Sequence, residues 1–145
     1  MKICSISEDI NIEKRVAITP EIAKKYLSLG FEVSITKNYG NHLGFIDEDY
    51  KSLGVKVVDK EDDIINSADI VVQMGLPNDE KLSLLKEGQI LIGVLNPYDN
   101  KEKIYSLTKK KIKSFSLELL PRITRAQSMD ILSSQANLAG YKAVI

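Results

Sequence analysis

Chemically versatile side chains are concentrated in residues 122–130, near the C-terminal end of this sequence. Two arginines, a glutamine, a serine and an aspartate follow Pro121, which interrupts a strand-like run. Binding and catalytic groups gather on loops that a rigid scaffold positions. The same composition also suits an ordinary solvated connection that caps the next helix. The residues alone therefore leave both interpretations open.

A second candidate is the pair of adjacent carboxylates Glu8 and Asp9, which follows the first apolar run. Such a pair could bind magnesium, as in a phospho-acceptor receiver domain. A receiver also needs an aspartate after its third strand, which Asp59 could supply, and a lysine after its fifth strand. Here the fifth apolar run leads into Asn96, and the next lysine is Lys101. This departure counts against a receiver-like regulatory module, which we keep as the non-catalytic alternative.

Arg15 lies just before Thr19 and Pro20, a pair that is typical of a helix start. A guanidinium beside a helix N-terminus suits a carboxylate or phosphate ligand. A structural ion pair with a nearby carboxylate is the other interpretation, and its candidate partners are Glu8, Asp9 and Glu13. Position alone favours the ion pair.

Composition excludes several classes of site. His42 is the only histidine and Cys4 the only cysteine, so we expect no metal cluster of Cys and His and no internal disulfide. Cys4 lies in an apolar run and is expected to be buried. Twenty Lys and Arg balance twenty Asp and Glu, which leaves no basic field for nucleic acid. The sequence has neither GxGxxG nor GxxxxGK(S/T), so a dinucleotide site of the Rossmann type is absent from it.

The two ends of the sequence carry further expectations. The first ten residues are too short and too acidic for a signal peptide. The longest apolar run, residues 90–95, is far shorter than a membrane span. We therefore expect a cytoplasmic location and no direct membrane insertion. The last helix-like run stops on Val144 and Ile145 without a capping residue, which suggests a piece of a longer polypeptide or a subunit that a partner completes.

Strand-like and helix-like segments alternate along the whole chain. This alternation predicts an α/β fold with three layers, in which helices cover both faces of an open, mostly parallel sheet of the Rossmann or flavodoxin type. A C-terminal linking helix should follow. Ligands of such sheets bind beyond the carboxyl ends of the strands, where residues 8–14, 75–78, 96–100 and 121–130 should lie. The expected strands are residues 2–7, 31–36, 55–58, 69–74, 89–95 and 112–119, and the expected helices start near residues 20, 47, 60, 79, 101 and 130, with Asp47 and Asp59 as caps.

Two stretches resemble a known family. Residues 13–20, EKRVAITP, are similar to the E-x-R-V-A-L-T-P opening that alanine dehydrogenases and nicotinamide nucleotide transhydrogenases share. Residues 117–144, LELLPRITRAQSMDILSSQANLAGYKAV, resemble the alpha subunit of the transhydrogenases, their NAD(H)-binding component, where its first domain ends. The resemblance implies an N-terminal α/β domain at residues 1–125. Residues 126–145 would start a helix that links to an NAD-binding Rossmann domain.

The resemblance also implies a site. In that family an Arg-Gln-Asp loop leans over the nicotinamide ring, and the motif falls here on Arg122, Gln127 and Asp130. Arg122 and Asp130 would orient the carboxamide, with Ser133 nearby, and Gln127 would reach toward the NADP(H) component. Guanidinium, amide and carboxylate groups can fix an amide through paired hydrogen bonds. Hydride transfer needs no protein acid or base, only two aligned rings, so a single histidine is no obstacle.

The same resemblance implies cofactors and partners. The complete enzyme would transfer hydride between NAD(H) and NADP(H) and couple the transfer to proton translocation. It would work as a homodimer at the inner face of the cell membrane, with NADP(H)-binding and transmembrane components as partners. This chain alone is expected to be inactive.

An alanine dehydrogenase-like domain is the sibling interpretation. That family has a lysine in the fourth strand and a histidine after the fifth, and the matching positions here hold Gln73 and Asn96. Both departures count against amino-acid chemistry, which needs a group that transfers protons. They also leave Arg15 without a substrate to bind.

Overall fold

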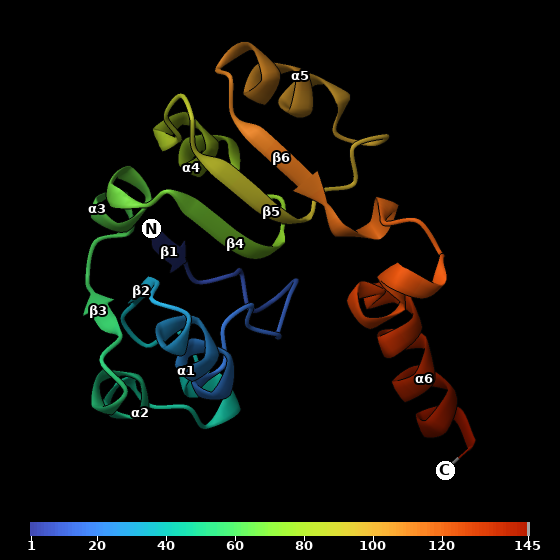
Figure 1. The fold of residues 1–145 in the computed structure, drawn as a ribbon, viewed down its shortest axis with the longest axis horizontal. Coiled ribbons are helices and arrows are strands. Elements are labelled where there is room, and N and C mark those ends of the chain that lie inside the picture. Colours follow the sequence, from blue (N-terminus) through green and yellow to red (C-terminus); the bar gives the residue numbers. More distant parts are fainter. Residues whose placement is uncertain (145) are drawn as a thin grey trace.

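A computed structural model describes residues 1–144 and shows one parallel sheet covered by helices (Figure 1). The strand order is β3-β2-β1-β4-β5-β6, and every pair of neighbours is parallel. The predicted α/β class and parallel sheet are confirmed. The strands are β1 Lys2–Ser5, β2 Glu32–Thr36, β3 Lys56–Val58, β4 Ile70–Gly75, β5 Ile90–Val94 and β6 Lys113–Ser116.

The order of the strands distinguishes the two sheet types that the sequence left open. Strand order 3-2-1-4-5-6 is that of Rossmann folds, whereas flavodoxins and receivers have the order 2-1-3-4-5. The sheet is therefore of the Rossmann type. The receiver-like alternative is wrong at the level of topology.

Helices cover both faces of the sheet, as predicted. Neighbouring strand residues point to opposite faces: Ile3 packs with Ala23 of α1 and Tyr50 of α2, whereas Cys4 packs with residues of α3, α4 and α5. Cys4 is buried, as expected. The helices are α1 Pro20–Ser28, α2 Asp47–Ser52, α3 Glu61–Ser67, α4 Asp79–Leu84, α5 Lys101–Lys109 and α6 Ile131–Val144, and the short 3-10 helices are η1 Asn41–Leu43, η2 Leu117–Leu119 and η3 Thr124–Met129.

The first helix begins as the sequence predicted. The Thr19 hydroxyl accepts a hydrogen bond from the Ile22 amide at 3.3 Å, and Pro20 occupies the first helical turn. A hydroxyl at this position satisfies one of the free amides of the first turn, and proline has no amide to satisfy.

Two predicted caps are wrong. Asp59 lies outside α3, whose N-cap is Lys60, and pairs with Lys37 at 3.2 Å. Asp47 is inside α2, and its carboxylate accepts the Asn38 amide at 2.8 Å. In both cases a neighbouring loop supplies a donor that competes with the helix amides.

The sixth strand is shorter than predicted. Residues 112–119 were expected as one strand, but β6 stops at Ser116 and η2 follows. The β5–β6 ladder ends at the pair Gly93 and Ser116. Because β5 itself ends at Val94, further strand residues would have no partner.

The last helix extends away from the sheet. Figure 1 shows α6 beyond the β6 edge, and none of its described residues is buried. The predicted linking helix is thus present, and it begins at Ile131 rather than at Asp130. Within residues 1–144 there is no helix with the length and apolar character that crossing a membrane requires.

Candidate functional site

A cleft of about 660 Å³ opens at the carboxyl edge of the sheet. It lies where β1 and β4 meet, which is the point at which the strand order reverses and where Rossmann folds bind ligands. The segments that follow β1, β4 and β5 line it, as the sequence predicted for residues 8–14, 75–78 and 96–100. The fourth predicted segment, residues 121–130, does not line this cleft.

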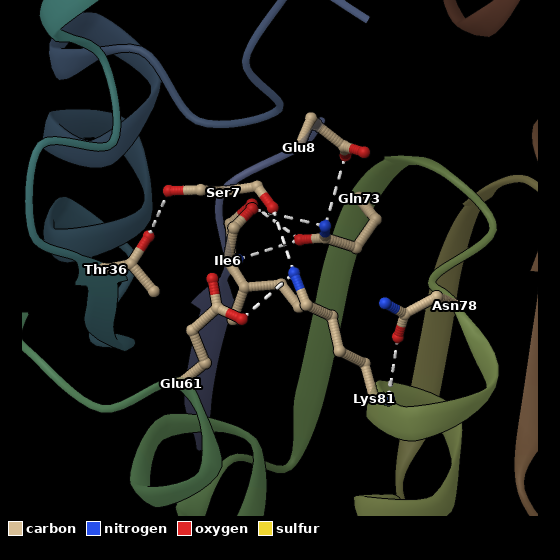
Figure 2. Close-up of polar contacts among 9 residues, drawn as sticks. Ile6, Ser7, Glu8, Thr36, Glu61, Gln73, Asn78 and Lys81 are labelled. Carbon is tan, nitrogen blue, oxygen red and sulfur yellow. Dashed lines mark hydrogen bonds and ion pairs between the residues drawn. The ribbon is translucent and has the colours of Figure 1, made fainter. Parts of the chain in front are cut away.

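The floor of the cleft is closed by Gln73, whose side chain is 4% exposed. Its carbonyl oxygen accepts from the Ser5 hydroxyl and the Ile6 amide, each at 2.9 Å. Its amide nitrogen donates to the Ile6 carbonyl at 3.2 Å and to Glu8 at 3.1 Å (Figure 2). Gln73 therefore ties β4 to the end of β1. A lone amide in an otherwise apolar strand was the signal for this role, which the sequence reasoning missed.

Glu8 is held over the same floor. One carboxylate oxygen accepts from the Met74 amide at 2.7 Å as well as from Gln73. Burial raises the pKa of Glu8, and hydrogen bonds from the Met74 and Gly75 amides oppose the rise. Asp9 turns instead to the Asn11 amide at 2.9 Å. The two carboxylates thus serve different partners, and residues 1–144 contain no group of three or more His, Cys, Asp and Glu side chains that could hold a metal ion.

Arg15 forms the structural ion pair that its position favoured. Its guanidinium donates to both carboxylate oxygens of Glu13, at 2.8 and 2.6 Å, and its backbone amide adds a third bond at 2.9 Å. The hydrogen bonds from Arg15 lower the pKa of Glu13. A guanidinium engaged in this way is already neutralised, so it is poorly placed to bind a separate anion.

The two lysines of the cleft are also paired. Lys81 contacts Glu61 at 2.9 Å and the Ser7 carbonyl at 3.3 Å (Figure 2). Lys103 contacts Asp79 at 3.0 Å. The cleft is thus lined by polar groups that largely bind one another, an arrangement that suits a rigid wall better than a reacting centre.

A second, smaller cavity of about 300 Å³ lies in the C-terminal part of the chain. It gathers all four site residues that the resemblance implied, which come from η3, its flanking residues and the first turn of α6. The buried side chain of Ala126, 4% exposed, fixes η3 against its surroundings. The lining residues are Arg122, Ile123, Thr124, Ala126, Gln127, Asp130 and Ser133.

Asp130 has a local structural role in this cavity. Its carboxylate accepts from the amides of Leu132 and Ser133, at 3.0 and 3.1 Å, and from the Ser133 hydroxyl at 2.6 Å. These bonds, the hydroxyl bond first, lower the pKa of Asp130. Asp130 therefore stays ionised near neutral pH and caps α6, so the capping interpretation of the loop holds beside the binding one.

Comparison with known proteins identifies the family. The sequence matches the family described as alanine dehydrogenase/PNT, N-terminal domain, over residues 6–139. The chain belongs to this family. It is 44% identical, over its whole length, to the first of the polypeptides that make up the NAD(P) transhydrogenase alpha subunit of Rickettsia prowazekii. The crystal structure of transhydrogenase from Sinorhizobium meliloti is 38% identical, covers 99% of the chain and superposes with a TM-score of 0.91.

The two branches of the family are not equally similar to this chain. An alanine dehydrogenase of Methanococcus maripaludis is 28% identical over 92% of the chain and is matched over 35% of its own length. The transhydrogenase branch is thus the nearer of the two. The chain spans 39% of the Rickettsia polypeptide and 43% of the Sinorhizobium chain, so it corresponds to about two fifths of these relatives.

Proposed function

We propose that this chain is the N-terminal domain of the alpha subunit of a proton-translocating NAD(P) transhydrogenase. The complete enzyme would transfer hydride between NAD(H) and NADP(H), coupled to proton translocation. The observation that carries the proposal is the 44% identity over the whole chain to a transhydrogenase alpha subunit. The meeting of Arg122, Gln127, Asp130 and Ser133 at one small cavity supports it.

The cavity suits a nicotinamide carboxamide by its chemistry. An amide substituent both donates and accepts hydrogen bonds, and Arg122 offers donors whereas Asp130 offers acceptors. In the proposal these two side chains orient the carboxamide, Ser133 supports Asp130, and Gln127 aligns the NADP(H) component. When bound, the dihydronicotinamide supplies the hydride, while the protein holds the ring in position and excludes water.

The proposal divides the nucleotide between two domains. The 145-residue sequence lacks a glycine-rich turn for a pyrophosphate. Residues 1–125 would therefore form one wall of the site, and residues 126–145 would lead into the Rossmann domain that binds NAD(H). The exposure of α6 along its described length supports a linking role.

Partners and location follow from the same proposal. The enzyme would be a homodimer that associates with NADP(H)-binding and transmembrane components. The domain would lie on the cytoplasmic side, peripheral to the inner face of the cell membrane. The Rickettsia relative is named as one piece of a divided alpha subunit, which supports an assembly of several components.

Two assays on the complete protein that carries this chain test the proposal against the alanine dehydrogenase alternative. NADH would be supplied with either NADP⁺ or pyruvate and ammonia as the hydride acceptor. We expect reduction of NADP⁺ and no formation of alanine, because Gln73 is fully engaged in hydrogen bonds and Asn96 has no titratable side chain. Formation of alanine without reduction of NADP⁺ would reject the proposal.

A further inference from the structure

One hydrogen bond fastens the C-terminal segment to the sheet. Residues 117–144 contain η2, the 121–130 loop and α6. Within the described chain their hydrogen bonds join residues close in sequence, apart from one. In that one, a carboxylate oxygen of Glu118 accepts from the backbone amide of Asn96 at 2.6 Å. None of the ion pairs of the described residues involves this segment.

The Glu118 carboxylate acts where the sheet ladder stops. The last paired residues of β5 and β6 are Gly93 and Ser116. Beyond them Asn96 adopts a left-handed backbone conformation, with φ of 45°. Its carbonyl accepts from the amides of Asp99 and Asn100, each at 3.0 Å. The turn therefore holds the Asn96 amide in place, and the side chain of Glu118 supplies the acceptor that a longer strand would have offered.

Burial distinguishes Glu118 from a surface charge. Its second carboxylate oxygen is buried and has no donor among the described residues. An acceptor buried in this way is unfavourable unless other interactions hold the side chain there. The charge-assisted bond to Asn96 is such an interaction. In addition, η2 packs against both β5 and α6, so this residue lies at the joint between the sheet and the last helix.

We propose that Glu118 is a positioning residue for hydride transfer. It would act through the Asn96 amide, by holding the 121–130 loop and α6 in a fixed place relative to the sheet. This inference rests on the proposed function. Loss of the bond would leave NAD(H) binding to the Rossmann domain but would misplace Arg122 and Asp130. A small misplacement can slow a transfer between aligned rings by about a hundredfold.

A distance measurement tests the anchoring without any nucleotide. Spin labels would be placed on two exposed helix positions by the substitutions Lys24→Cys in α1 and Lys142→Cys in α6. Cys4 is 1% exposed and burial raises the pKa of its thiol to about 12, so labelling spares it. Pulsed electron–electron resonance should give a narrow distance distribution for the parent protein.

Three substitutions then decide the structural question. Glu118→Ala should broaden the distribution because it removes the acceptor for Asn96. Glu118→Gln should keep it narrow, because its amide oxygen can accept the same bond. Glu87→Ala is the matched control: it removes an equal charge from an exposed pair with Lys111. A narrow distribution for Glu118→Ala, or a broad one for Glu118→Gln, would overturn the proposal.

Kinetics of the complete enzyme decide the functional question. Glu118→Ala should lower kcat by about tenfold to a hundredfold, with KM for NADH within about twofold, because only the alignment of the rings is lost. Glu118→Gln should restore kcat, and a wild-type kcat in Glu118→Ala would contradict the inference. Arg122→Ala reports separately on the proposed function. If Arg122→Ala transfers hydride normally, the site itself is wrong, whatever the distance measurement shows.

Discussion

At the scale of single residues, the four polar side chains of the small cavity carry the proposal. Their types and order in the sequence predicted that they act together, and the structure brings them to one cavity. Their hydrogen bonds could not be predicted from the sequence. Asp130 is engaged by the first turn of α6 and by Ser133, because a carboxylate beside free helix amides binds them first.

The titration of Asp130 tests this local structure. Its lowered pKa means that the ionised form stabilises the start of α6 above the ordinary pKa of aspartate, and that this stabilisation is lost as pH falls through the lowered value. Ser133→Ala should raise the pKa of Asp130 toward its ordinary value, because it removes the largest cause of the shift. Carbon-13 NMR of the Asp130 carboxyl measures both proteins.

A neighbouring serine supplies the control. Ser134 donates its hydroxyl to the Ile131 carbonyl and not to Asp130. Ser134→Ala should therefore leave the titration unchanged. An equal shift in both variants would show that the hydroxyl of Ser133 is not the cause.

At the scale of elements, the alternation of strands and helices predicted the architecture well. The start of α1 was readable from Thr19 and Pro20 because both act on the adjacent turn. The end of β6 was not readable, because it depends on where the partner strand β5 stops. Asp59 and Asp47 were misassigned for a similar reason: their partners, Lys37 and Asn38, are distant in sequence or belong to another loop.

The tie between β4 and β5 makes a testable demand at this scale. A side-chain carbon added at Gly93 would lie 2.6 Å from the backbone carbonyl oxygen of Gln73. Gly93→Ala must therefore push the two strands apart, and we expect a loss of about 1–3 kcal/mol in the free energy of unfolding, typical of overpacking. Urea unfolding measures it.

Gly140 is the matched control for that substitution. It lies in the exposed helix α6, and an added carbon there meets nothing within 4 Å. Gly140→Ala should leave stability unchanged or raise it by up to about 1 kcal/mol, because alanine favours helix more than glycine does. Equal stability of the Gly93→Ala variant and the parent would show that β4 and β5 are not so closely packed.

At the scale of the whole molecule, the chain combines a braced α/β domain with an outlying helix. The cleft at the switch point is where related folds bind ligands, yet its cations are paired and Gln73 closes its floor. The predicted site lies instead in the segment that leads to α6. Sequence reasoning located that site through a resemblance, since periodicity and composition alone left residues 121–130 as a possible solvated loop.

The most direct test of the central claim follows the hydride itself in the complete enzyme. NADH labelled with deuterium at the transferred position would be mixed with NADP⁺ in a single turnover. We expect the deuterium in NADPH, and a transfer rate that falls more than about tenfold in Arg122→Ala and Asp130→Asn, because ring alignment dominates this chemistry. Arg125→Ala, which alters an arginine outside the cavity lining, should transfer at nearly the parent rate. Unlabelled NADPH, or near-normal transfer by both Arg122→Ala and Asp130→Asn, would contradict the account.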